Sequence, residues 1–207
     1  MTALVTVRHQ AAIAGRVTDT QTGRGLGAAL VRITAAPAEF MAWLNLHALQ
    51  YGAMWTTRLD RLDQTVTAAD GHFHFVDLPN GQYTLTASLP GLGSRYGAQQ
   101  AQATVARTAE GKIVMAVADL ALSPTTLMGK VTGPNGATVV MAQVRVNGSG
   151  ERTYSNGQGR YLLTGLEVGN RKVSVSAQGF QPVTQAMTLG AAGDERTLNF
   201  SLVPSTP

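Results

Sequence analysis

Residues 67–92, TAADGHFHFVDLPNGQYTLTASLPGL, decide the fold of this chain because their pattern occurs twice. Residues 155–180, SNGQGRYLLTGLEVGNRKVSVSAQGF, align with them without a gap. The matching positions are glycines and apolar residues: Gly71 with Gly159, Phe73 with Tyr161, Phe75 with Leu163, Leu78 with Leu166, Gly81 with Gly169 and Leu85 with Val173. Self-similarity at this level predicts two copies of one structural unit.

Apolar and polar residues alternate within each copy. Phe73 and Phe75 fall on one side of a strand while His72 and His74 fall on the other. Turn-forming sequences such as Asp70-Gly71 separate the alternating segments. The pattern predicts an all-β protein made of two tandem antiparallel β-sandwiches, with domains at 1–125 and 126–207.

Further matching segments lie on both sides of the repeat. GRVTD at 15–19 corresponds to GKVTG at 129–133, and LALSP at 120–124 corresponds to FSLVP at 200–204. With the DG-F-F--LP-G-Y-L-A---G pattern of residues 70–91, these segments resemble the carboxypeptidase regulatory-like domain, a prealbumin-like β-sandwich. The resemblance implies an accessory module, of the kind attached to zinc peptidases, outer-membrane receptors, surface adhesins and phage-tail-like contractile particles.

Two other kinds of β-sandwich domain suggest further sites to consider in this chain. The chain also resembles surface domains that form an internal isopeptide bond, and Lys130 and Asn199 match two of the three positions involved. The acid position falls at Ala87 in one copy and at Val175 in the other, so we expect no such bond. Starch-binding sandwiches bind sugar on exposed aromatic residues, for which Tyr96 and Tyr154 are the candidates, while Tyr161 is expected in the core.

Composition excludes several classes of function. The chain has 207 residues, a formal charge of +4 and no cysteine, and its basic residues are dispersed. We therefore expect no nucleic-acid partner, no cofactor and no cysteine-based metal site. His72 and His74 lie on the same face of a strand and are expected to face solvent without binding a metal. No sequence motif of a hydrolase, a nucleotide-binding enzyme or a zinc peptidase occurs, so we expect no enzyme.

The first residues, MTALVTVRHQ, have no basic segment followed by a long apolar run. No run of the sequence has the roughly 18–20 apolar residues that a membrane helix needs. We therefore expect a chain without a membrane span, located in the cytoplasm or in a particle assembled there. The alternative is an extracellular or surface location.

Residues from about 35 to 64 form an insertion in the first copy only, since the second copy makes the same connection with far fewer residues. Pro37 and Glu39 favour a helix start, and Gly52 favours its end or a hinge. If the helix continues through Gly52, one face carries the candidate partner-binding residues: Phe40, Trp43, Leu44, His47, Tyr51, Met54 and Trp55. A second apolar row consists of Ala42, Leu46, Leu49 and Ala53.

A helix that is apolar on most sides is normally covered on two sides. Its own sandwich supplies one cover, and the other would come from a protein partner or from a second copy in a homo-oligomer. The sequence therefore predicts a non-enzymatic structural or adaptor protein that docks through its helical insertion, in an assembly such as a phage-tail-like contractile injection particle. Two alternatives remain: the helix caps its own sandwich, or the chain is a surface or secreted module for adhesion or carbohydrate binding.

Overall fold

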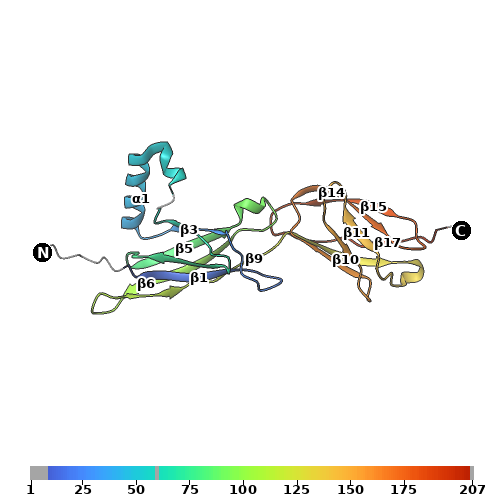
Figure 1. The fold of residues 1–207 in the computed structure, drawn as a ribbon, viewed down its shortest axis with the longest axis horizontal. Coiled ribbons are helices and arrows are strands. Elements are labelled where there is room, and N and C mark those ends of the chain that lie inside the picture. Colours follow the sequence, from blue (N-terminus) through green and yellow to red (C-terminus); the bar gives the residue numbers. More distant parts are fainter. Residues whose placement is uncertain (1–8, 59–60, 206–207) are drawn as a thin grey trace. The chain divides into compact units, whose positions relative to one another are not determined.

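The computed structural model describes residues 9–58 and 61–205. The chain forms two compact units, namely unit 1 with Met1–Gly91 and Ala98–Leu122, and unit 2 with Leu92–Gly97 and Ser123–Pro207. Each unit is a β-sandwich built mostly from antiparallel pairs, and the first carries a helical insertion (Figure 1). The predicted fold class is confirmed.

The strands of unit 1 are β1 (Ala11–Asp19), β2 (Leu30–Ala35), β3 (Gln64–Val66), β4 (His72–Val76), β5 (Gly81–Ser88), β6 (Gln99–Arg107), β7 (Ile113–Val114), β8 (Ala116–Val117) and β9 (Leu120–Leu122). In the described residues one sheet has the order β3-β2-β5-β6-β7, and the other has the order β4-β1-β8, with β9 also paired to β1. Phe73 and Phe75 of β4 are buried between the sheets, whereas His72 and His74 are exposed, as their alternation predicts.

The strands of unit 2 are β10 (Thr126–Thr132), β11 (Gln143–Val146), β12 (Arg152–Tyr154), β13 (Arg160–Thr164), β14 (Gly169–Ser176), β15 (Val183–Leu189), β16 (Glu195–Thr197) and β17 (Phe200–Ser201). The described sheets have the orders β12-β11-β14-β15 and β13-β10-β16, with β17 also paired to β10. Leu127, Val144, Val173 and Phe200 belong to the core between them, and Tyr161 is buried there as expected.

A glycine in the first strand of each sandwich allows a close approach of the backbone. A Cβ atom on Gly129 would lie 1.9 Å from the carbonyl oxygen of Leu198 and 2.9 Å from the ring of Tyr161. Tyr161 is the cross-strand partner of Gly129, and its hydroxyl donates to the same Leu198 carbonyl at 2.5 Å. The equivalent contacts in unit 1 are made by Gly15, the carbonyl of Ala118 and the ring of Phe73. No side chain fits at either glycine.

A buried hydroxyl also recurs at equivalent positions of the two units. In unit 1 the Thr67 hydroxyl accepts a hydrogen bond from the Ala29 N–H at 2.9 Å and donates to the Leu26 carbonyl at 2.7 Å. Ser155 of unit 2 makes the same two kinds of hydrogen bond with its own backbone neighbours. These hydroxyls satisfy backbone groups where the sheet ladder does not reach them.

The insertion lies between β2 and β3, as the sequence predicts. Helix α1 (Ala38–Tyr51) follows Pro37 and ends before Gly52, whose φ is 54°. A 3-10 helix, Gly52–Thr57, comes next. Of the two outcomes that the sequence allows at Gly52, a helix end and a hinge, the structure has the end, because the positive φ of this glycine ends the α-helical hydrogen bonding. Shorter 3-10 helices lie at Pro90–Leu92 and Pro134–Gly136.

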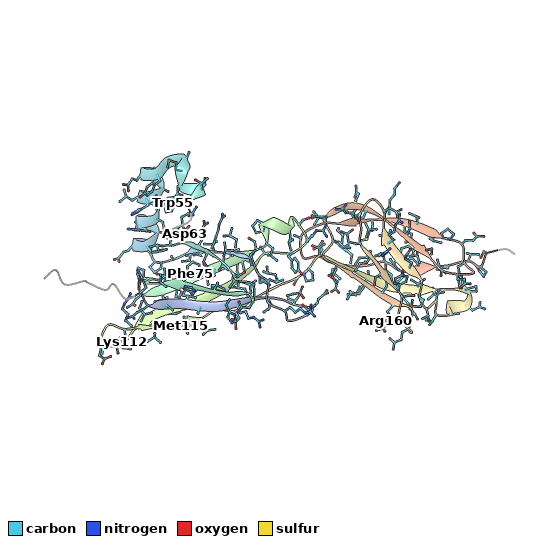
Figure 2. All side chains as sticks on the ribbon, in the orientation of Figure 1. Trp55, Asp63, Phe75, Lys112, Met115 and Arg160 are labelled. Carbon is cyan, nitrogen blue, oxygen red and sulfur yellow. The ribbon has the colours of Figure 1, made fainter. Side chains whose placement is uncertain are left out.

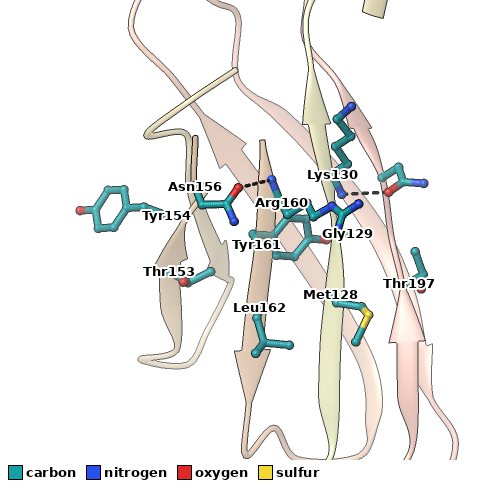
Figure 3. Close-up of a pocket in the computed structure, with 11 residues that line it drawn as sticks. Met128, Gly129, Lys130, Thr153, Tyr154, Asn156, Arg160, Tyr161, Leu162 and Thr197 are labelled. Atoms are coloured by element: carbon teal, nitrogen blue, oxygen red, sulfur yellow. Dashed lines mark hydrogen bonds between the residues drawn. The ribbon is translucent and has the colours of Figure 1, made fainter. Parts of the chain in front are cut away.

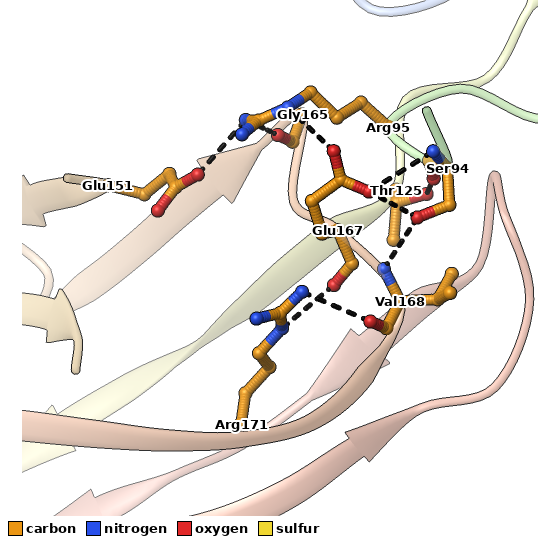
Figure 4. Close-up of polar contacts among 8 residues, drawn as sticks. All are labelled: Ser94, Arg95, Thr125, Glu151, Gly165, Glu167, Val168 and Arg171. Carbon is orange, nitrogen blue, oxygen red and sulfur yellow. Dashed lines mark hydrogen bonds and ion pairs between the residues drawn. The ribbon is translucent and has the colours of Figure 1, made fainter. Parts of the chain in front are cut away.

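The segment Leu92–Gly97 belongs to unit 2 although it connects β5 to β6 in the sequence. The Ser94 hydroxyl donates to Glu167 at 2.5 Å, and its oxygen accepts a hydrogen bond from the Val168 N–H at 2.9 Å (Figure 4). The backbone N–H of Thr125 donates to the Arg95 carbonyl at 2.8 Å. The domain division predicted from the sequence, at residue 125, assigns this segment to the first domain; its polar groups bond within unit 2.

Arg95 is the centre of this polar cluster. Its guanidinium donates to Glu151 at 3.0 Å, to Glu167 at 3.1 Å and to the Gly165 carbonyl at 2.6 Å. The pKa of the Glu167 carboxyl lies below its ordinary value of 4.5, because the Ser94 hydroxyl and N–H donate to the ionised form and Arg95 attracts it. The pKa of Glu151 is lowered as well, first by the Ser149 hydroxyl and then by Arg95, against the effect of burial.

We expect Gly129→Ala to destabilise unit 2 by about 1–3 kcal/mol, the usual cost of forcing extra volume into a packed core. The added methyl group would overlap the Leu198 carbonyl, which the sheet holds in place. Urea unfolding followed by circular dichroism measures the change. Gly157→Ala is the matched control, since no atom lies within 4 Å of its Cβ position; equal stability of the two variants would contradict the close-approach argument.

We expect Glu167→Gln to lower the stability of unit 2 at neutral pH, with a difference from wild type that shrinks as the pH falls. The folded pKa of Glu167 is depressed, so the ionised carboxyl stabilises the fold above its unfolded pKa, and this contribution is lost as the pH falls through the folded pKa. Thermal unfolding between about pH 7 and about pH 3 checks this. Glu195→Gln, at an exposed position of β16, is the control, and a constant difference between Glu167→Gln and wild type at all pH values would contradict the assignment.

Candidate docking surface on the helical insertion

Pro37 and the first two turns of α1 attach the insertion to the β-sandwich of unit 1. Pro37 packs over β5, where a Cβ atom on Gly81 would lie only 2.4 Å from the proline ring. Phe40 is 5 % exposed and Leu44 is 6 % exposed, and the Phe40 ring meets the ring of Tyr83 edge-on at 5.9 Å between centroids. From this base α1 projects away from the sheets (Figure 1).

Tyr83 is itself held firmly beneath the helix. Its side chain is buried, and its hydroxyl donates to the carbonyl oxygen of Pro79 at 2.8 Å. Burial raises the pKa of this hydroxyl to about 12, so it stays protonated at neutral pH and remains a donor. The contact between Phe40 and Tyr83 therefore rests on a fixed residue of the sandwich.

Aromatic side chains continue from this base along one side of the insertion. Trp43 and His47 lie 3.9 Å apart between ring centroids, His47 and Tyr51 lie 6.4 Å apart, and Tyr51 and Trp55 lie 6.3 Å apart. Their spacing of four residues places them on consecutive turns. We call Trp43, His47, Tyr51 and Trp55 the aromatic ladder.

Two arginines from the returning chain cover the far part of the aromatic ladder. The Arg58 guanidinium lies 4.1 Å from the centre of the Tyr51 ring, and that of Arg61 lies 4.7 Å from the centre of a Trp55 ring. A cation above an aromatic ring is attracted electrostatically to the face of the ring. Arg61 also pairs with Asp63, which is buried where the insertion rejoins the sheet (Figure 2). The hydrogen bonds that Arg61 donates to the Asp63 carboxylate raise the pKa of Arg61, so the guanidinium stays charged.

The opposite side of the insertion is apolar and exposed. Leu46 is 63 % exposed and Leu49 is 83 % exposed; Met54, in the 3-10 helix that follows, is 68 % exposed. The small residues of the same row, Ala42 and Ala53, are exposed as well. We call Leu46 and Leu49 the outer apolar face. Exposed aliphatic side chains gathered on one element are typical of an interaction surface.

The seven predicted partner-binding residues therefore have different surroundings. Phe40 and Leu44 are buried within unit 1 and position the helix. Trp43, His47, Tyr51 and Trp55 form the aromatic ladder, and Met54 is exposed on the 3-10 helix. Leu46 and Leu49 were placed in the second apolar row by the sequence but not among the candidates, and their heptad-like spacing from Ala42 was the signal that could have identified them.

A metal site, an isopeptide bond and a membrane span were also considered from the sequence. The described residues contain no group of three or more His, Cys, Asp or Glu side chains placed to hold a metal ion. His72 is exposed, with its Nδ1 atom 3.0 Å from Asp70. Lys130 is exposed on the sheet β13-β10-β16, whereas Val175, at the acid position of an isopeptide bond, is buried on the other sheet of unit 2. No helix in the described part of the chain is long and apolar enough to cross a membrane.

Comparison with solved structures gives distant likenesses. The shaft pilin SpaA from Lactobacillus rhamnosus GG is 11 % identical, with a TM-score of 0.45 and coverage of 98 % of this chain and 99 % of that chain. The minor pilin GBS52 from Streptococcus agalactiae is 12 % identical, with a TM-score of 0.33 and coverage of 94 % and 96 %. A type II cohesin–X-dockerin complex from Acetivibrio cellulolyticus is 12 % identical, with a TM-score of 0.32; the match covers 39 % of this chain and 58 % of that chain. None of these likenesses bears on function.

No curated protein matches the chain. The family model of the carboxypeptidase regulatory-like domain matches twice, over residues 12–116 and 126–203. The first match spans the insertion, and the two together include the described strands of both sandwiches apart from the first residue of β1, the last residue of β8 and the whole of β9. The chain belongs to the carboxypeptidase regulatory-like domain family, of which it carries two copies.

Proposed function

We propose that this chain is a non-enzymatic structural or adaptor protein that docks to a partner protein through the outer apolar face of its insertion. The observation that carries the proposal is the exposure of Leu46, Leu49 and Met54 on an element that the aromatic ladder and the Phe40 contact hold in place. Family membership supports an accessory role rather than catalysis. A preformed apolar element loses little conformational entropy when it binds.

The partner we propose is a different protein with an apolar groove. Helix α1 has 14 residues, which span about 21 Å at about 1.5 Å per residue. A helix surface of that length and about 10 Å width offers about 200 Å², far below the roughly 800 Å² per partner of a stable interface. Two copies that meet only helix to helix would therefore bury too little, whereas a groove that wraps the helix can reach the required area.

The assembly we propose is a phage-tail-like contractile particle, assembled in the cytoplasm, in which this chain joins other subunits. The resemblance of its domains to accessory modules of such particles supports this placement. A role in adhesion on a cell surface is the second candidate. Isolation of the native particle or of the cell envelope, followed by mass spectrometry, decides between them by the fraction in which the chain is found.

We expect Leu46→Gln/Leu49→Gln to abolish retention of the partner from native lysate while the thermal stability of the chain stays within about 0.5 kcal/mol of wild type, because both side chains are exposed. Val114→Gln/Met115→Gln is the matched control, since it removes two apolar side chains that are also exposed, each at 51 %. Light scattering on the purified chain tests self-association. A stable homo-oligomer that depends on Leu49, or equal retention by both variants, would contradict the proposal.

We expect Trp55→Ala to weaken partner retention without unfolding the sandwich. Trp55 stacks on Tyr51 and lies beneath Arg61, beyond the part of the helix that touches unit 1. Its loss should loosen the outer end of the insertion and raise the entropy cost of docking. Hydrogen exchange of residues 45–57 measures the loosening; loss of the cooperative unfolding of unit 1 would show instead that the insertion caps the sandwich.

A further inference from the structure

Two cations face each other on the outer surface of unit 2. Lys130 of β10 is the direct cross-strand partner of Arg160 of β13, and both side chains are exposed. Like charges at directly opposite positions of a sheet destabilise it. Within the described residues, neither cation forms an ion pair with a carboxylate. The sandwich thus holds two positive charges together without a negative charge to offset them.

The two cations line a groove of about 570 Å³ on the outer face of the sheet β13-β10-β16 (Figure 3). Met128 and Leu162 supply apolar surface within it. The residues that line the groove include no Asp or Glu. Its volume lies in the range of sites that bind small molecules or a few units of a polymer.

Two asparagines add hydrogen-bond donors to the groove. The Oδ1 atom of Asn156 accepts hydrogen bonds from the backbone N–H groups of Arg160 and Gln158, at 3.0 and 2.9 Å. The Oδ1 atom of Asn199 accepts one from the N–H of Lys130 at 2.9 Å. Because the oxygens are engaged with the backbone, the amide NH₂ groups are left as donors. The groove offers donors and cations to a ligand rich in acceptors.

The first sandwich shows how differently the same face can be built. Arg16 takes the place of Lys130, and its N–H donates to the carboxylate of Asp119, where unit 2 has Asn199. Asp70 stands at the position of Gln158. Two carboxylates of unit 1 are thus replaced by amides in unit 2. Unit 1 has equal numbers of basic and acidic residues, so the formal net charge of +4 comes from unit 2.

From this juxtaposition we propose that the groove of unit 2 binds an acidic polysaccharide, with Lys130 and Arg160 on the carboxylate or sulfate of one sugar and the amides of Asn156 and Asn199 on neighbouring hydroxyls. The apolar surface of Met128 and Leu162 suits the less polar face of a sugar ring. This site is separate from the insertion and does not depend on the proposed docking function.

Other polyanions fit the groove less well. On the face of a sheet the backbone groups are engaged in the ladder, so an acidic peptide finds no main-chain partners there. Single-stranded nucleic acids bind on successive exposed aromatic rings. The Tyr161 ring of the groove is buried, and the Tyr154 side chain at its rim points away from the other lining residues (Figure 3).

The test is calorimetric titration of the full chain with octagalacturonic acid, a heparin octasaccharide, maltooctaose and an octaglutamate peptide. We expect one or both acidic saccharides to bind, more weakly as salt is added, and the tighter of the two identifies the anionic group. Lys130→Gln/Arg160→Gln should weaken binding at least about tenfold, since hydrogen bonds from cations to an anion are lost. Asn199→Asp/Gln158→Asp should also weaken binding at least about tenfold. This variant should keep the fold of unit 2, because unit 1 has Asp119 and Asp70 at the equivalent positions.

Arg145→Gln/Lys172→Gln is the matched control, since it removes two exposed charges from the other sheet of unit 2. We expect its affinity to stay within about twofold of wild type. Equal weakening by both double variants would show attraction to overall charge and overturn the proposal. So would binding of neither acidic saccharide, equal binding of maltooctaose, or tighter binding of the peptide.

Discussion

The contact on which each sandwich depends is the close approach of a carbonyl group to a glycine of its first strand. In unit 2 the Leu198 carbonyl lies where a side chain of Gly129 would be, and the Tyr161 ring closes the space from the facing strand. The same approach, at Gly15, brings the last strand of unit 1 beside its first. This parallel pairing joins the beginning of each unit to its end, so the remaining strands are arranged around it. The glycines of GRV and GKV are therefore the part of the repeat that tolerates least change.

The two copies share this strand pairing and differ in one connection and in the outer face of one sheet. Unit 1 lengthens the connection between β2 and β3 into a helix that projects from the sandwich, whereas unit 2 makes the equivalent turn with residues 147–151. Unit 2 instead changes the outer face of its β13-β10-β16 sheet, where amides replace carboxylates and two cations stand opposite each other. One framework thus presents an apolar element in the first copy and a cationic groove in the second.

The repeat made the fold predictable, because glycines and alternating apolar residues report directly on turns and on the buried side of strands. The insertion was found by comparison of the two copies, and its helix start at Pro37 followed from local preference. Gly52 was identified as the end of the helix or a hinge, and local preference alone could not decide between the two. The sequence separates Phe40 and Leu44 from Leu46 and Leu49 as two rows, but a helix that is apolar on most sides does not show which row packs on the sandwich. The membership of Leu92–Gly97 in unit 2 and the arginines over the aromatic ladder depend on tertiary contacts that leave no periodic pattern.

The central claim is that the insertion is an addition to unit 1 that serves docking, and not a cap that the sandwich needs. Replacement of residues 36–63 by Asn-Gly-Ser-Gly-Glu, the connection that unit 2 uses at 147–151, tests it most directly. Thermal unfolding of this chain should show that unit 1 keeps a cooperative transition, at a midpoint lowered by the lost contact between Phe40 and Tyr83. A chain in which unit 1 has no cooperative transition, with Tyr83 exposed and the sandwich unfolded, would contradict the account and assign the insertion to the core of the fold.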